Sequence, residues 1–118
     1  MKKRILICDD EEGIRESLRL ILEKEYELSF ATRGKEAIEI IKREPIDIVI
    51  IDIKMPRMDG IETMRELKAL RPNVRILVTS GYKSVETAQE AVNAGASDYI
   101  VKPFERAEIL DAVRKYIS

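Results

Sequence analysis

Short apolar runs alternate with amphipathic stretches along the chain, and this alternation restricts the fold more than any other feature of the sequence. Five short apolar runs, most of them rich in β-branched residues, predict strands at residues 5–8, 28–31, 46–51, 74–78 and 99–101. The stretches between them repeat apolar residues every three or four positions, which is the spacing of an amphipathic helix. The sequence therefore predicts strand–helix units in succession.

Five apolar stripes and their stop signals define the expected helices. The stripes are Ile14, Leu18, Ile21 and Leu22; Ala37, Ile38 and Ile41; Ile61, Met64 and Leu67; Val85, Ala88 and Val92; and Ile109, Leu110, Val113 and Ile117. Pro72 and Gly95 follow the third and fourth helices, and Ser84 is placed to cap the fourth. Gly60, after Asp59, predicts a tight turn at the start of the third helix, where glycine supplies backbone freedom.

Strands separated by helices favour right-handed crossovers and a parallel sheet covered on both faces. Five strands are too few for an eight-stranded barrel, so we expect an open, doubly wound α/β sheet. Residues 1–118 fit one domain of this kind. Ligands of such sheets bind at the carboxyl ends of the strands.

Polar side chains stand at the carboxyl ends of four expected strands. They are Asp9 and Asp10, Asp52, Thr79 and Ser80, and Lys102. In the strand order 2-1-3-4-5, which we assume here, these four strands are neighbours and their side chains converge. Three carboxylates at one place repel one another unless a cation joins them, and Mg²⁺ favours such oxygen ligands. With Lys102 as a fixed positive charge, the set suits phosphoryl transfer to a carboxylate.

Each of these residues also has a purely structural interpretation. Asp9 and Asp10 could cap the first helix, and Asp52 could open a turn. Ser80 could be a loop residue and Lys102 a solvated surface lysine. Their coincidence at four strand ends favours a site.

Composition excludes several other classes of protein. The chain has no histidine, so we expect any metal to be held by oxygen ligands. Its net charge is −1, so the chain as a whole has no positive charge that would attract nucleic acid. The single cysteine, Cys8, cannot form an internal disulfide, and its apolar neighbours predict a buried, inert thiol. The first apolar run is too short for a signal peptide or a membrane span. We therefore expect a cytoplasmic protein with no membrane contact.

Three segments resemble the response regulator receiver family, and the likeness covers essentially the whole chain. Residues 5–11 resemble its acidic first loop, residues 47–56 and 58–60 its phosphoacceptor strand and loop, and residues 95–104 its fifth strand with a lysine. The resemblance implies a single receiver domain over residues 1–118, with a flavodoxin-like (βα)₅ fold and strand order 2-1-3-4-5.

The resemblance also implies the roles of the site residues. Asp52 is the expected phosphoacceptor, and Lys102 is expected to pair with the phosphoryl group. The expected Mg²⁺ ligands are Asp10, Asp52 and the backbone carbonyl of Lys54, with Asp9 close by or acting through water. The Lys102–Pro103 peptide is expected to be cis.

A hydroxyl and an aromatic residue form the expected switch. Thr79 and Ser80 are both candidates for the hydroxyl, and the family spacing of 22 positions before Lys102 selects Ser80 as the second catalytic residue. Tyr99 matches the family's aromatic switch. Phosphorylation is then expected to draw Ser80 inward, turn Tyr99 and change the face made by the fourth helix, fifth strand and fifth helix.

The implied partners are a sensor histidine kinase and an output domain or target protein, with a phosphorylation-dependent homodimer allowed. Small phosphodonors could replace the kinase, and the chain would catalyse only its own phosphorylation and dephosphorylation. Lys54 and Tyr82, near the site, could tune the lifetime of the phosphoryl group. The alternatives are an Mg²⁺-dependent phosphohydrolase with an aspartate nucleophile, a flavodoxin-like cofactor binder and a phosphorylation-independent interaction module.

Overall fold

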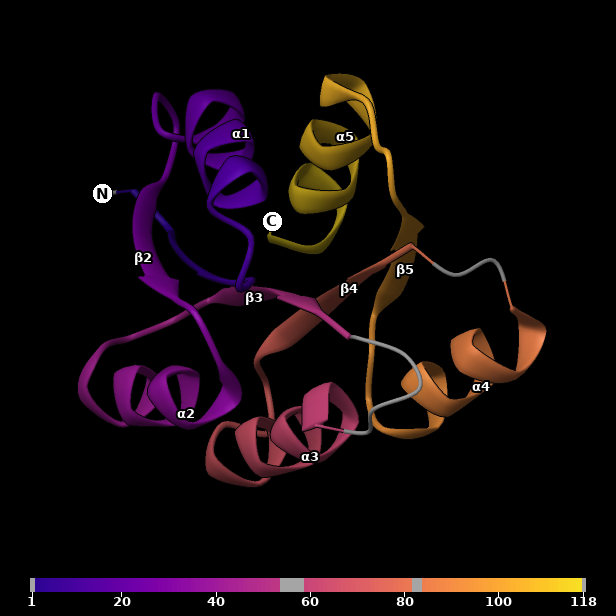
Figure 1. Cartoon of the computed structure of the whole chain (residues 1–118). Coiled ribbons are helices and arrows are strands. Elements are labelled where there is room, and N and C mark those ends of the chain that lie inside the picture. The colour runs from indigo at the N-terminus through magenta and orange to yellow at the C-terminus, as the bar shows by residue number, and fades with distance from the viewer. Residues whose placement is uncertain (1, 54–58, 82–83, 118) are drawn as a thin grey trace.

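A computed structural model describes residues 2–53, 59–81 and 84–117. Parallel strands form one sheet in the order β2-β1-β3-β4-β5, as predicted, and helices cover both of its faces (Figure 1). The elements are β1 (Arg4–Cys8), α1 (Glu12–Leu22), β2 (Glu27–Ala31), α2 (Gly34–Arg43), β3 (Ile48–Asp52), α3 (Asp59–Leu70), β4 (Arg75–Ser80), α4 (Val85–Asn93), β5 (Asp98–Val101) and α5 (Arg106–Ile117). None of the helices in the described part of the chain is long and apolar enough to span a membrane.

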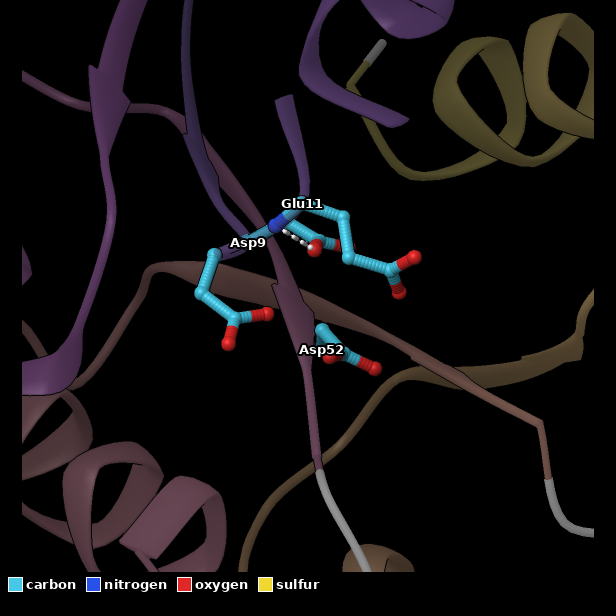
Figure 2. A group of neighbouring side chains, drawn as sticks. Asp9, Glu11 and Asp52 are labelled. Carbon is cyan, nitrogen blue, oxygen red and sulfur yellow. Dashed lines mark hydrogen bonds between the residues drawn. The ribbon is translucent and has the colours of Figure 1, made fainter. Parts of the chain in front are cut away.

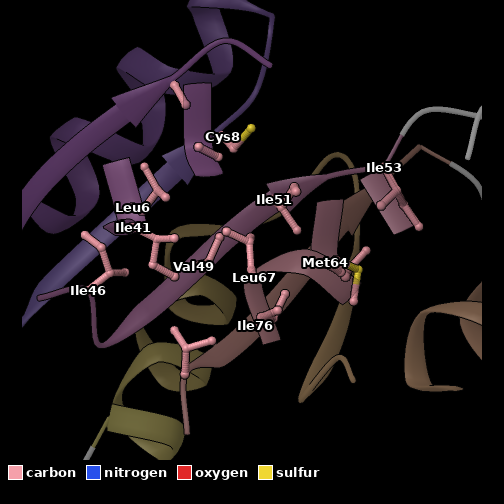
Figure 3. Packing of buried hydrophobic residues seen from close by; sticks show 14 of the residues in the cluster. Leu6, Cys8, Ile41, Ile46, Val49, Ile51, Ile53, Met64, Leu67 and Ile76 are labelled. Atoms are coloured by element: carbon pink, nitrogen blue, oxygen red, sulfur yellow. The ribbon is translucent and has the colours of Figure 1, made fainter. Parts of the chain in front are cut away.

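Two hydrophobic cores lie on opposite faces of the sheet because successive strand residues point to opposite sides. On one face, Leu6, Val49 and Ile76 pack against Met64 and other residues of α2, α3 and α4 (Figure 3). On the other face, Ile7 and neighbouring strand residues pack against α1 and α5. The inner strands β1 and β3 are apolar on both faces, which explains their continuous apolar runs.

Helix α4 forms as predicted, but its buried face differs from the expected stripe. Val85 and Val92 are 83% and 56% exposed, whereas Thr87 and Ala91 are buried against the sheet. The apolar stripe that indicated this helix in the sequence therefore does not mark its buried face. Small side chains let the helix approach the sheet, so the larger valines remain on its outer side. The predicted cap is confirmed, since Ser84 accepts a hydrogen bond from the Thr87 N–H at 3.3 Å.

Gly60 is required for a close approach and not for an unusual backbone conformation. A Cβ atom at this position would collide with the Ile53 side chain just after β3. Among the described glycines only Gly95, after α4, has a positive φ, of 108°. The expected cis peptide between Lys102 and Pro103 is confirmed.

Candidate functional site

The carboxyl ends of β1, β3, β4 and β5 lie together at one edge of the sheet. Asp9 directly follows β1, Asp52 ends β3, and Lys102 directly follows β5. Figure 2 shows the carboxylates of Asp9, Glu11 and Asp52 gathered at this edge. The structure therefore brings together residues that lie far apart in the sequence, as the strand pattern predicted.

Lys102 is the central cation of this cluster. Its Nζ lies 3.0 Å from Asp9 Oδ2, 3.2 Å from Asp52 Oδ1 and 3.5 Å from Glu11 Oε1. The lysine side chain is 14% exposed, and those of Asp9 and Asp52 are 2% and 7% exposed. Lys102 is therefore no solvated surface lysine.

The loop between β1 and α1 is fixed by hydrogen bonds to Asp9. Asp9 Oδ1 accepts the Glu11 N–H at 2.9 Å, and Arg15 Nη1 donates to the Asp9 carbonyl at 2.7 Å. Glu11 is the N-cap residue of α1, and its side chain makes no capping hydrogen bond. These contacts orient Asp9 toward Lys102, so its main role is in the charge cluster.

The cluster shifts the ionisation of its buried members. Burial, followed by the charge of Asp9, raises the pKa of Asp52, although Lys102 opposes this shift. Burial alone would lower the pKa of Lys102, but hydrogen bonding to Asp9 and the charges of Asp52 and Asp9 raise it overall. Lys102 therefore stays protonated, while Asp52 carries an unfavourable charge that a further cation would stabilise.

Four carboxylates offer a set of ligands for that cation. Oxygen atoms of Asp9, Asp10, Glu11 and Asp52 all lie within 4.8 Å of one another. A single lysine does not balance four negative charges. Hard divalent cations prefer oxygen ligands in such an arrangement. The residues present therefore could hold a metal ion and fit the chemistry of Mg²⁺.

The two candidate switch hydroxyls lie on opposite faces of β4. Ser80 lies two residues after Val78 and so points to the same face of β4; Val78 belongs to the same core cluster as Tyr99. Thr79 lies two residues after Leu77, which belongs to the cluster on the opposite face. Thr79 pairs with Asp52 in the strand register, and Ser80 comes one residue later. The alternation of side chains along each strand therefore places Ser80 and Tyr99 on one side of the sheet. This placement supports the prediction that the two residues act together as a switch.

Some expected residues cannot be placed, and others were missed from the sequence. Lys54 and Tyr82 lie outside the described residues. Cys8 is buried as predicted, and burial, with the charges of Asp9 and Asp52, raises the pKa of its thiol to about 12. Glu11 is a member of the carboxylate cluster. Arg15 holds the loop that carries the cluster through its hydrogen bond to the Asp9 carbonyl. The adjacency of Glu11 to Asp9 and Asp10 was a usable signal, whereas nothing in the sequence marked Arg15.

Comparisons with known proteins agree with this geometry. The family model described as "Response regulator receiver domain" matches residues 5–114. Sporulation initiation phosphotransferase F of Bacillus subtilis (strain 168) is 39% identical over 118 residues, covering 99% of this chain and 95% of the relative. A CheY-like response regulator receiver domain protein from Methanospirillum hungatei JF-1 superposes with a TM-score of 0.92 at 35% identity, over 99% of this chain and 94% of that chain.

A further solved structure contains a phosphorylated aspartate. It is a response regulator protein from Burkholderia pseudomallei "with a phosphorylated aspartic acid, calcium ion and citrate". Its TM-score is 0.85 at 30% identity, over 99% of this chain and 67% of that chain. That protein therefore carries a phosphorylated aspartate.

Proposed function

The chain belongs to the response regulator receiver family, and we propose that it is the phosphoacceptor switch of a two-component signalling system. Asp52 accepts the phosphoryl group, from a phosphohistidine of a sensor histidine kinase or from a small phosphodonor. The observation that carries this proposal is the contact of one buried lysine, Lys102, with both Asp9 and Asp52 at the edge of the sheet. The protein transfers no group to a separate substrate.

In the proposed reaction, a carboxylate oxygen of Asp52 forms a bond to phosphorus. The bond between phosphorus and the donor's nitrogen or oxygen breaks, and its electron pair remains with the donor. Lys102 stabilises the charge on the phosphoryl oxygens as they approach Asp52. Asp10, Asp52 and the Lys54 carbonyl would hold Mg²⁺, assisted by Asp9, and the bound ion would supply further charge neutralisation.

The proposed output is a change of surface away from the site. A phosphoryl group on Asp52 attracts the Ser80 hydroxyl at the end of β4, and Tyr99 on β5 turns into the space vacated. The face formed by α4, β5 and α5 then changes for an output domain, a target protein or a second copy of the chain. A nearly complete switch needs a free-energy difference of about 5.5 kcal/mol between the states. The proposed location is the cytoplasm, with no direct contact to nucleic acid or membrane.

Intact mass spectrometry tests the acceptor directly. We expect the wild-type protein to gain the mass of one phosphoryl group with Mg²⁺ and acetyl phosphate, and the Asp52→Ala variant to gain none. Chelation of the metal should prevent the gain. Lys54 and Tyr82 are proposed to set how long the group remains.

A negative result has a defined meaning. If the wild-type protein neither gains mass nor binds beryllofluoride, the phosphorylation-independent interaction module becomes the better account. Steady turnover of a generic phosphate ester would instead favour the phosphohydrolase.

A further inference from the structure

Asp10, an expected Mg²⁺ ligand, lies in the exposed loop between β1 and α1. Its carboxylate belongs to the group whose oxygen atoms lie within 4.8 Å of one another. A residue in an exposed loop keeps conformational freedom that is lost when its carboxylate binds a cation. A contact that holds this loop in its binding conformation before the ion arrives therefore strengthens binding.

Asp9, the residue before it, is held at each of its polar atoms. Its N–H donates to the Ala31 carbonyl at the end of β2 at 3.1 Å, and its Oδ2 accepts from Lys102 Nζ at 3.0 Å. Its Oδ1 accepts the Glu11 N–H at 2.9 Å (Figure 2), and its carbonyl oxygen accepts from Arg15 Nη1 at 2.7 Å. The last bond comes from a side chain that belongs neither to the carboxylate group nor to its lysine.

Arg15 contacts the backbone on both sides of Asp10. Its guanidinium donates to the Asp9 carbonyl, and its own backbone N–H donates to the Glu11 carbonyl at 3.1 Å. Because a peptide unit is planar, a fixed Asp9 carbonyl also fixes the N–H and Cα of Asp10. The next peptide unit is held through the Glu11 N–H, which donates to Asp9 Oδ1. The backbone of Asp10 is therefore held between two fixed peptide units.

We propose that Arg15 is a positioning residue of the metal site, and that its bond to the Asp9 carbonyl holds Asp10 in the conformation that binds Mg²⁺. The inference rests on the proposed function, in which Asp10 is a ligand of that ion. Arg15 acts through the backbone and not on the phosphoryl group. Removing a group that orients a metal ligand commonly weakens metal binding by about 10- to 100-fold.

The positive charge of Arg15 separates this role from a purely electrostatic one. A cation beside the site repels a divalent ion, so charge alone predicts that removing the guanidinium strengthens Mg²⁺ binding. Loss of a positioned ligand predicts weaker binding. The two roles therefore predict changes in affinity of opposite sign.

The Mg²⁺ dissociation constants of the wild type and the Arg15→Gln variant test the proposal. They are measured with Mg²⁺ alone, from the rise of the free energy of unfolding in urea with ion concentration at constant ionic strength. We expect Arg15→Gln to raise the dissociation constant about tenfold. Arg19→Gln is the matched control, because it removes an equal charge one turn later on α1, where Arg19 pairs with Glu16 and Glu23. It should leave the dissociation constant within about twofold of wild type.

The rate of phosphorylation by acetyl phosphate supplies a second measurement. We expect Arg15→Gln to need about tenfold more Mg²⁺ for its half-maximal rate. At saturating Mg²⁺ the rate should stay within about twofold of wild type, because Asp52 and Lys102 are unchanged. A merely structural role of Arg15 would instead lower the free energy of unfolding in a chelator and leave the Mg²⁺ dissociation constant unchanged.

The other outcomes contradict the role of Arg15 or the function on which it rests. An unchanged or smaller dissociation constant in Arg15→Gln would overturn the role of this arginine. An equal increase in Arg19→Gln would overturn it too, because the effect would then belong to the helix in general. A wild-type protein that binds Mg²⁺ but gains no phosphoryl group would contradict the function of Asp52, while the dissociation constants would still decide the role of Arg15.

Discussion

At the scale of single residues, the most informative group is Asp52, whose carboxylate is destabilised in the folded protein. Burial and the neighbouring Asp9 charge raise its pKa above the ordinary value of 3.8. A raised carboxyl pKa stabilises the folded state below pH 3.8, and this contribution is lost as the pH rises through the folded pKa. At neutral pH the ionised Asp52 therefore lowers the free energy of unfolding.

We accordingly expect Asp52→Asn to raise the free energy of unfolding at pH 7, in the presence of a chelator, by about 1 kcal/mol. The difference from wild type should shrink as the pH falls below the folded pKa of Asp52. Urea unfolding at several pH values measures this. Asp111→Asn, at an exposed position on α5, is the control and should leave stability nearly unchanged. A less stable Asp52→Asn variant would show that the pairing with Lys102 outweighs burial.

The sequence predicted these site residues because each of them stands at the carboxyl end of a strand. Asp9, Asp52 and Lys102 could be aligned at one edge once the strand order was assumed. Their sequence positions could not show that Lys102 reaches three carboxylates, because that depends on side-chain conformations.

At the scale of elements, the least accurate prediction concerned α4. Its periodicity correctly indicated a helix, but the apolar stripe of valines lies outside and the contact with the sheet is made by Thr87 and Ala91. Hydropathy ranks valine above alanine, whereas close packing of a helix on a sheet depends on side-chain volume. The boundaries of β3 also differed, because Ile46 and Asp47 precede the strand.

Substitutions on the two faces of α4 should therefore differ in their effect. We expect Val92→Ala to change the free energy of unfolding by less than about 0.5 kcal/mol. Ala91→Leu should lower it by about 1–3 kcal/mol, because the added volume has no space against the sheet. Urea unfolding of both variants distinguishes them. A larger loss for Val92→Ala than for Ala91→Leu would show that the valine side of α4 is its packed side.

At the scale of the whole molecule, the cluster of carboxylates stores repulsion within an otherwise well-packed sheet. Asp9, Asp10, Glu11 and Asp52 converge, and Lys102 offsets only one of their charges. The fold as a whole was predictable because both the alternation of strands and helices and the buried inner strands leave few possible topologies.

Divalent cations should consequently stabilise the entire domain. We expect Mg²⁺ at a hundred times its dissociation constant to raise the free energy of unfolding by about 2.7 kcal/mol. Thermal or urea unfolding with Mg²⁺, compared with NaCl of equal ionic strength, measures this effect. Asp10→Asn should abolish most of the gain, while Asp111→Asn should keep it. Equal stabilisation by NaCl would indicate general screening and no specific site.

The contact between Lys102 and Asp9 joins residues 93 positions apart. A ribosome makes Asp9 near the beginning of this chain and Lys102 near its end. A nascent chain that has not yet released β5 therefore has Asp9 and Asp52 but lacks Lys102, the cation that pairs with both. The charge cluster can therefore assemble only after synthesis has passed Lys102.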